Sequence, residues 1–178
     1  MPILPIITYP DPVLKKAAEP IDQVDEEVLR LAEDMVHTLH MSSSGVGLAA
    51  PQVGRSCRLV VIDLSFRRSG EPDPLILINP EIVEEEGEVL SEEGCLSVPD
   101  YLAEVQRALR VRVQALNLQG EPMEIEADDF LAIVLQHEAD HLDGTLILDH
   151  VSPFKRQLYR RKIKKALKEQ QHKSPSQE

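Results

Sequence analysis

The stretch that most constrains this chain is VLQHEADHLDG at 134–144, which contains the pattern H-E-x-x-H. His137 and His141 are four residues apart, so on a helix their imidazoles lie on one face and can bind one metal ion. Glu138 is displaced from His137 by roughly 100° around such a helix, close enough to act on a metal-bound water without being a ligand. Gly144 stands where this helix would end. The pattern favours a metal site over the alternative, a helix with two buried, hydrogen-bonded histidines.

A catalytic site of this type needs a third protein ligand. One family of metalloproteases takes it from a histidine six residues after the second one, but here that position is Ile147. Another takes a glutamate from a later helix, where this chain offers only Glu169 in a basic segment. Cys95, in EEGCLSVP, remains as a candidate, because a thiolate is a strong ligand and loses its proton on binding. The alternative for Cys95, as for Cys57, is a buried inert thiol.

The composition restricts the class of protein. A length of 178 residues with 42% hydrophobic residues predicts one domain with a real core, over 1–170, followed by a frayed tail over 171–178. The net charge of −12 argues against DNA or an anionic membrane as a partner. The chain shows neither a signal-peptide pattern nor an apolar run near 18 residues, so we expect a soluble, cytoplasmic protein. Nine of its nineteen Lys and Arg fall within 155–173, which predicts a basic helix there.

Hydrophobic patterning predicts the remaining elements. We expect a helix capped by Asp22 and running to about Met41. The expected strands are 58–64, 75–78, a pair over 81–90 that turns at Gly87, 109–118, 123–126 and 145–148. The final helix is expected from Phe154; if it is a solvated face over the core, Leu158, Ile163, Ala166 and Leu167 would lie beneath it. The predicted fold class is α+β, with antiparallel β-sheets packed around the central helix that carries H-E-x-x-H, and with a C-terminal helix.

Three segments, taken together, resemble a known family. GVGLAAPQVG at 45–54, EGCLS at 93–97 and QHEADHL at 136–142 are similar, in this order, to the three signatures of peptide deformylase. The resemblance spans roughly 2–165. It implies an enzyme that removes the N-formyl group from the initiator methionine of nascent bacterial-type polypeptides and releases formate.

The resemblance also implies a role for each matching residue. Cys95, His137 and His141 would hold the metal, Glu138 would be the general acid/base for a metal-bound water that attacks the formyl carbonyl, and Gln52 with the backbone N–H of Leu96 would form the oxyanion hole. The ligand types alone suggest zinc, whereas the family implies Fe(II) in the cell, with nickel, cobalt or zinc as substitutes. Each oxyanion donor is worth on the order of 3–4 kcal/mol in such reactions.

The substrate site is expected at the glycine-rich segment. Val46, Leu131 and Val134 are candidates for the wall of a methionine pocket. Gly45, Gly47 and the backbone near Val98 could pair with the peptide as an added strand.

Three positions differ from the family pattern or extend it. Leu102 stands where many members carry an arginine near the peptide groove, which leaves contacts to later substrate residues open. Asp129 replaces a common glycine at the start of the H-E-x-x-H helix. Arg107 matches a basic position of the family, and we expect it to pair with Glu93, which would otherwise be buried alone.

Two other functions share the helix motif. The chain could be a zinc endopeptidase, or a metal-binding domain without catalysis. The basic C-terminal helix is equally compatible with a solvated face over the core and with electrostatic binding to ribosomal RNA.

Overall fold

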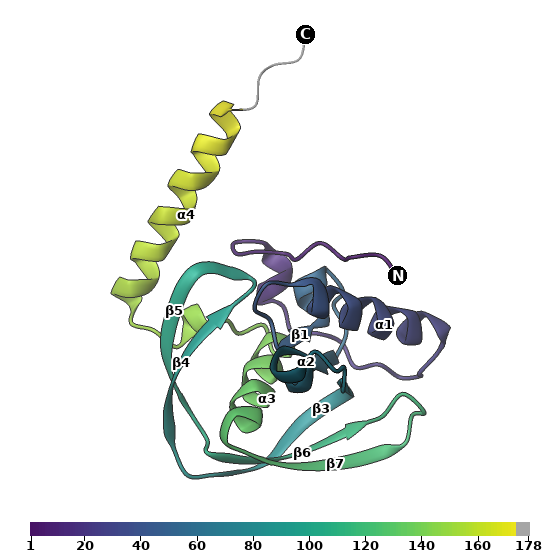
Figure 1. The fold of residues 1–178 in the computed structure, drawn as a ribbon. Helices are drawn as coiled ribbons and strands as arrows, with labels where there is room; N and C mark the ends of the chain where they lie inside the picture. The colour runs from purple at the N-terminus through teal and green to yellow at the C-terminus, as the bar shows by residue number, and fades with distance from the viewer. Residues whose placement is uncertain (174–178) are drawn as a thin grey trace.

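A computed structural model describes residues 1–173, and its central element is the helix that carries H-E-x-x-H. The helices are α1 (Glu26–Met41), α2 (Leu64–Ser69), α3 (Asp129–Leu142) and α4 (Pro153–Lys173), with single turns of 3-10 helix at η1 (Pro12–Lys15), η2 (Ala50–Val53) and η3 (Ile147–Asp149). The strands are β1 (Gly47–Ala49), β2 (Leu59–Ile62), β3 (Leu75–Glu86), β4 (Val89–Cys95), β5 (Val98–Arg107), β6 (Arg110–Leu116) and β7 (Pro122–Asp128). Figure 1 shows α3 between the β4–β5 ribbon and the larger sheet. The predicted α+β class with antiparallel sheets is confirmed.

The larger sheet has the order β1-β2-β3-β6-β7 and is antiparallel throughout, while β4 and β5 form a separate two-stranded sheet. All four residues of β2 are buried, which explains why this strand is continuously apolar rather than alternating. Val60 and Ile62 belong to one hydrophobic cluster, and Leu59 and Val61 to another. Successive side chains of a strand point to opposite faces, so β2 is covered on both sides.

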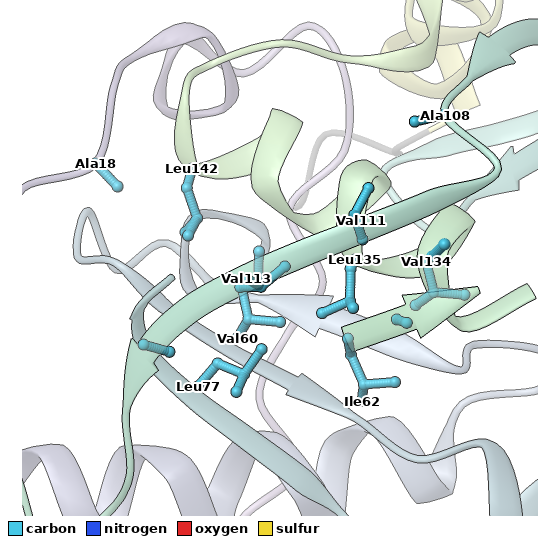
Figure 2. Close-up of a cluster of buried hydrophobic side chains, with 14 residues drawn as sticks. Ala18, Val60, Ile62, Leu77, Ala108, Val111, Val113, Val134, Leu135 and Leu142 are labelled. Atoms are coloured by element: carbon cyan, nitrogen blue, oxygen red, sulfur yellow. The ribbon is translucent and has the colours of Figure 1, made fainter. Parts of the chain in front are cut away.

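Helices α3 and α1 provide these two covers. Figure 2 shows Leu135, Val134 and Leu142 of α3 against Val60, Ile62, Leu77 and Val113 of the sheet. The second cluster packs Met35 and Leu39 of α1 against the other face. Helix α3 has buried residues on several of its sides, so it places its histidines in the interior of the protein.

The predicted strand pair over 81–90 is wrong in its pairing. Strands β3 and β4 do flank Gly87, which has φ +70°, but they do not pair with each other. β3 pairs with β6, whereas β4 pairs with β5. Gly87 therefore passes the chain from one sheet to the other.

Two further expectations are corrected. The first helix begins at Glu26 and is capped by Asp25, whose side chain accepts from the Val28 N–H, not by Asp22. The predicted strand at 145–148 is instead irregular at 145–146 and then enters η3; Leu146, Ile147 and Leu148 are buried. A short run of apolar residues does not distinguish a strand from a helical turn, because both can bury all of its side chains.

Helix α4 leaves the body of the protein, as Figure 1 shows. Tyr159 is buried and Ile163 is half-buried, but Leu158 and Leu167 are 49% and 44% exposed. The alternative in which Leu158, Ala166 and Leu167 lie beneath the helix is thus wrong, because no element among residues 1–173 covers these three side chains. The helix continues to Lys173, three residues into the tail expected over 171–178; the rest of that tail lies outside the described residues. No helix among residues 1–173 is both long and apolar enough to span a membrane.

Candidate metal centre and active site

Helix α3 presents His137 and His141 to the same point. Their ring centroids are 5.1 Å apart, as expected for side chains separated by four residues on a helix. His141 is 2% exposed, and the side chain of His137 is 13% exposed. The helix ends at Leu142, and Gly144 takes the left-handed conformation (φ +74°) just beyond it, as its place after the motif predicts.

Cys95 reaches this point from the end of β4. It pairs with Val98 across a two-residue turn formed by Leu96 and Ser97. Its Sγ lies 3.3 Å from His141 Nε2, and one ligand atom from each of Cys95, His137 and His141 lies within 4.8 Å of the others. Tetrahedral ligands with a metal–sulfur bond near 2.3 Å and a metal–nitrogen bond near 2.0–2.1 Å would stand about 3.5 Å apart. The three donors therefore fit one metal ion.

Glu93 orients one of these histidines. Its Oε1 lies 2.8 Å from His137 Nδ1, so Nδ1–H donates to the carboxylate and Nε2 is left with its lone pair for a ligand. Burial opposes ionisation of Glu93, yet hydrogen bonds from His137 and Arg107 lower its pKa to about 2. A permanently charged acceptor thus holds the imidazole in one tautomer.

Arg107 balances this buried charge, and its predicted pairing with Glu93 is confirmed. Its Nε and Nη2 each donate to a Glu93 oxygen at 2.9 Å. Its Nη1 donates to Asp140 Oδ2 at 2.7 Å, the same oxygen that His150 Nε2 contacts at 2.7 Å. Of these contacts, only the pair of Arg107 with Glu93 was predicted; those of Asp140 with Arg107 and His150 were not. Asp140 lies inside the third motif, between the two histidines, and that position was the available signal.

Glu138 is buried beside the ligands and points at the glycine-rich segment. Burial raises the pKa of its carboxyl to about 7, although His137 acts in the opposite direction. Its Oε2 has no hydrogen-bond partner among the described residues. A Cβ added at Gly47 would lie 2.4 Å from Glu138 Oε1. Only glycine therefore lets the backbone of β1 approach this carboxylate.

Gln52 is held in one orientation next to the cysteine. Its Oε1 accepts from the Ala49 N–H at 2.9 Å, so its Nε2 faces Ser97 Oγ at 3.2 Å and Cys95 Sγ at 3.7 Å. Gln52 is 2% exposed and Ser97 is fully buried. The contact of Gln52 with Ser97 is a further feature that sequence reasoning missed, since 45 residues separate them.

The predicted substrate residues differ in how far they are buried. Gly45 lies against Leu96, because a Cβ there would be 2.8 Å from Leu96 Cδ1. Val46 and Leu131 are half-buried against the main cluster, in which Val134 is 5% exposed. Val98 is 1% exposed, so only its backbone is available to a ligand, as the prediction specified. His37 and His40, on α1, are not part of the ligand cluster.

The arrangement combines three residues that could hold a metal ion, a buried carboxylate with a pKa near neutrality and a fixed amide donor. Such a set is suited to metal-assisted hydrolysis of an acyl group.

Comparison with known proteins identifies the family. The family model described as polypeptide deformylase matches residues 3–157. A peptide deformylase of Alkalilimnicola ehrlichii is 47% identical over 95% of this chain and 93% of its own length. Peptide deformylase 2 of Vibrio parahaemolyticus is 49% identical over 96% and 99% of the two chains.

Solved structures agree with this assignment. The crystal structure of a peptide deformylase from Legionella pneumophila superposes with a TM-score of 0.86 at 44% identity, covering 98% of this chain and all of the other. One from Ehrlichia chaffeensis, in complex with actinonin, gives 0.86 at 40% identity and covers 93% and 98% of the chains. Sequence, fold and the geometry around Cys95, His137 and His141 lead to one conclusion: this chain is an enzyme of the polypeptide deformylase family, whose members are metal-dependent hydrolases.

Proposed function

We propose that this protein removes the N-formyl group from the initiator methionine of nascent polypeptides and releases formate, with residues 1–170 as one catalytic domain. The observation that carries the proposal is the convergence of Cys95, His137 and His141 within 4.8 Å, beside the buried carboxylate of Glu138. The relatives named peptide deformylase match nearly the whole chain. Such a substrate would place the enzyme in the cytoplasm, where nascent chains emerge.

Cys95, His137 and His141 would hold one divalent ion. The family favours Fe(II) in the cell, with zinc, nickel or cobalt as substitutes, although thiolate and imidazole donors also suit zinc. When bound, the ion supplies a nucleophile at neutral pH by lowering the pKa of water from 15.7 towards about 7. The ionised Glu93, through its contact with His137 Nδ1, keeps that ligand in the required tautomer.

Glu138 would act as the general acid/base. A carboxyl with a pKa of about 7 can both accept and return a proton near neutrality. Its free Oε2 takes the proton of the attacking water and hands it to the leaving amine of methionine. The backbone at Gly47 lies close to this carboxylate. The small space that remains favours the formyl group, the smallest acyl group.

Gln52 and Leu96 would stabilise the negative charge that develops on the formyl oxygen. Gln52 Oε1 accepts from the Ala49 N–H, which aims Gln52 Nε2 towards the cysteine, so this donor needs little reorganisation during the reaction. Leu96 offers its backbone N–H from the adjoining turn. Gly45, Gly47 and the backbone of Val98 would pair with the peptide, with Val46, Leu131 and Val134 near the methionine side chain.

Helix α4 would contribute to the choice of partner. It carries nine of the nineteen basic residues and projects from the body (Figure 1), so it is not merely a cover of the core. We propose that it draws the enzyme to ribosomal RNA in a salt-dependent manner. Cosedimentation with ribosomes that is lost above physiological salt would support this, whereas cosedimentation unchanged by deletion of α4 would contradict it.

The deciding experiment uses protein purified without oxygen. Formyl-Met-Ala-Ser should release formate, and a chelator should abolish the release until a divalent metal is restored. Glu138→Gln should keep its metal content and lose the activity. Cleavage of an internal peptide bond without formate release would instead indicate an endopeptidase, and unchanged activity in Glu138→Gln would remove Glu138 from the mechanism.

A further inference from the structure

Helix α2 (Leu64–Ser69) has no fully buried residue; Leu64 is half-buried against the main hydrophobic cluster, and Arg67 is exposed. Its long-range polar contacts run from Arg67 to the segment that precedes β1. We propose that Arg67 is a positioning residue for the reaction: it holds the backbone at Ser42 and Gly45 so that the wall formed by 45–47 keeps its place against Leu96 and Glu138. The inference rests on the deformylase function proposed above.

Within residues 1–173, the side chain of Arg67 donates to acceptors of this segment and of the end of α1. Its Nε donates to the Gly45 carbonyl at 3.0 Å. Its Nη2 donates to the Leu39 carbonyl at 3.3 Å, to Ser42 Oγ at 3.0 Å and to the Ser42 carbonyl. Hydrogen bonds from a charged donor are stronger than neutral ones, and a cation is favoured at a helix C-terminus. Among the described residues Arg67 has no ion pair, so its charge serves these carbonyls.

The wall formed by 45–47 lies so close to its neighbours that only glycine fits at Gly45 and Gly47. A Cβ at Gly45 would come within 2.8 Å of Leu96 Cδ1 and Ser42 Oγ, and one at Gly47 within 2.4 Å of Glu138 Oε1. The backbone at 45–47 therefore lies close to the Leu96 side chain on one side and to the Glu138 carboxylate on the other. A shift of this segment would change the substrate site without altering any metal ligand.

Asp63 fixes the other end of α2. Its Oδ1 accepts from the Phe66 N–H at 2.9 Å, and its Oδ2 contacts His40 Nε2 at 2.8 Å and the Asp73 N–H at 3.0 Å. Its own N–H donates to the Val46 carbonyl at 2.8 Å. The His40 ring stacks on Phe66 with centroids 4.0 Å apart. Asp63 and Arg67 thus hold successive carbonyls of the wall, at Val46 and Gly45, from one short helix.

The test compares Arg67→Ala, Arg67→Lys and Arg68→Ala as metal-loaded enzymes. Arg68 is the exposed neighbour on the same helix, so its variant is the matched control. We expect Arg67→Ala to raise KM for formyl-Met-Ala-Ser about tenfold, because 45–47 would pair with the peptide, while kcat stays within about threefold, because Glu138 and the proposed metal ligands keep their own contacts. Arg67→Lys should recover part of this loss, and Arg68→Ala should match the wild type.

Hydrogen exchange of the amides at 43–47 provides a readout that is independent of turnover. Exchange should be faster in Arg67→Ala than in Arg68→Ala. A KM within twofold of wild type in Arg67→Ala, or unchanged exchange at 43–47, would overturn the inference. A wild-type enzyme that releases no formate would refute the proposed function instead, and the exchange comparison would then decide the role of Arg67 alone.

Discussion

At the scale of single residues, Arg107 neutralises the buried charge of Glu93, which contacts the proposed metal ligand His137. Its side chain is 4% exposed, and the Glu93 side chain is 6% exposed. The pair is bidentate, and the remaining Nη1 reaches Asp140. Burying one charge without its partner is costly, so removing one member of the pair should destabilise the fold through the charge that remains.

Replacing Arg107 by Leu should therefore lower the free energy of unfolding by about 3–5 kcal/mol, because Glu93 would remain buried without its cation. Urea denaturation measures the change. Arg110→Leu is the control, since its contact with Glu86 is 3.9 Å long and both side chains are more than 60% exposed; it should cost less than about 1 kcal/mol. Wild-type stability in Arg107→Leu would show that the pair does not matter.

Gly47→Ala should reduce kcat by roughly 100-fold, which is the scale of loss when a reacting group is displaced by about 1 Å. The added methyl group would overlap the carboxylate of Glu138 at 2.4 Å from Oε1. Formate release measures the effect, and the metal content together with the melting temperature establishes that the variant is folded. Near-normal turnover would mean that Glu138 is not used in the position described.

At the scale of elements, α4 is attached to the body through its first half, where Tyr159 is buried, Ile163 is half-buried and Arg156 donates to the Leu148 carbonyl. Tyr159 is 3% exposed, its hydroxyl donates to the Pro99 carbonyl at 2.9 Å, and its ring contacts Tyr9 and Tyr101 with centroids 5.9 and 5.0 Å away. From residue 164 onward the described side chains of the helix are exposed. The two halves of α4 therefore contribute differently to stability.

Tyr159→Ala should lower the free energy of unfolding by about 3–5 kcal/mol, as for other large aromatic side chains removed from a core. A chain that ends after Ile163 should lose no more than about 0.5 kcal/mol, because the side chains described beyond that residue, at 164–172, are exposed. Chemical denaturation of both variants tests the contrast. A truncation as damaging as Tyr159→Ala would mean that the distal half is packed against the protein.

At the scale of the whole molecule, stability depends on carboxylates that are ionised in the fold. The Asp63 side chain is fully buried. Burial opposes ionisation of Asp63, yet hydrogen bonds from the Phe66 N–H, His40 and the Asp73 N–H bring its pKa below the usual 3.8. Burial likewise opposes ionisation of Asp149, while the Leu146 N–H and Lys15 lower its pKa. A carboxyl with a lower pKa in the fold than in the unfolded chain stabilises the fold above its unfolded pKa, and this contribution disappears as the pH falls through the folded value.

Acidification below about pH 4 should therefore lower the free energy of unfolding, and Asp63 should account for part of the slope. Asp63→Asn should be less stable than wild type at pH 7, and the difference should shrink as the pH approaches 3. Urea denaturation at several pH values gives both curves. Parallel curves for the two proteins would show that the charge on Asp63 does not contribute.

The sequence by itself determined the parts of this protein that depend on local geometry. The spacing of His137 and His141 places both rings on one helical face, and Gly144 ends that helix. The pattern of β6 and the basic composition of α4 also predicted their elements. Cys95 was a candidate ligand because a thiolate binds metals strongly and no other third ligand fitted, and the resemblance then implied that role; no local spacing rule places it beside the histidines.

Only the tertiary structure decided what depends on segments far apart in the chain. It set which strands pair across Gly87, how much of α4 is covered, and that 145–148 is not a strand. It also set the contacts of Glu93 with His137, of Gly47 with Glu138 and of Arg67 with the wall. Local spacing determines which way a side chain leaves its own helix or strand, whereas its partners across the core follow from how all segments pack together.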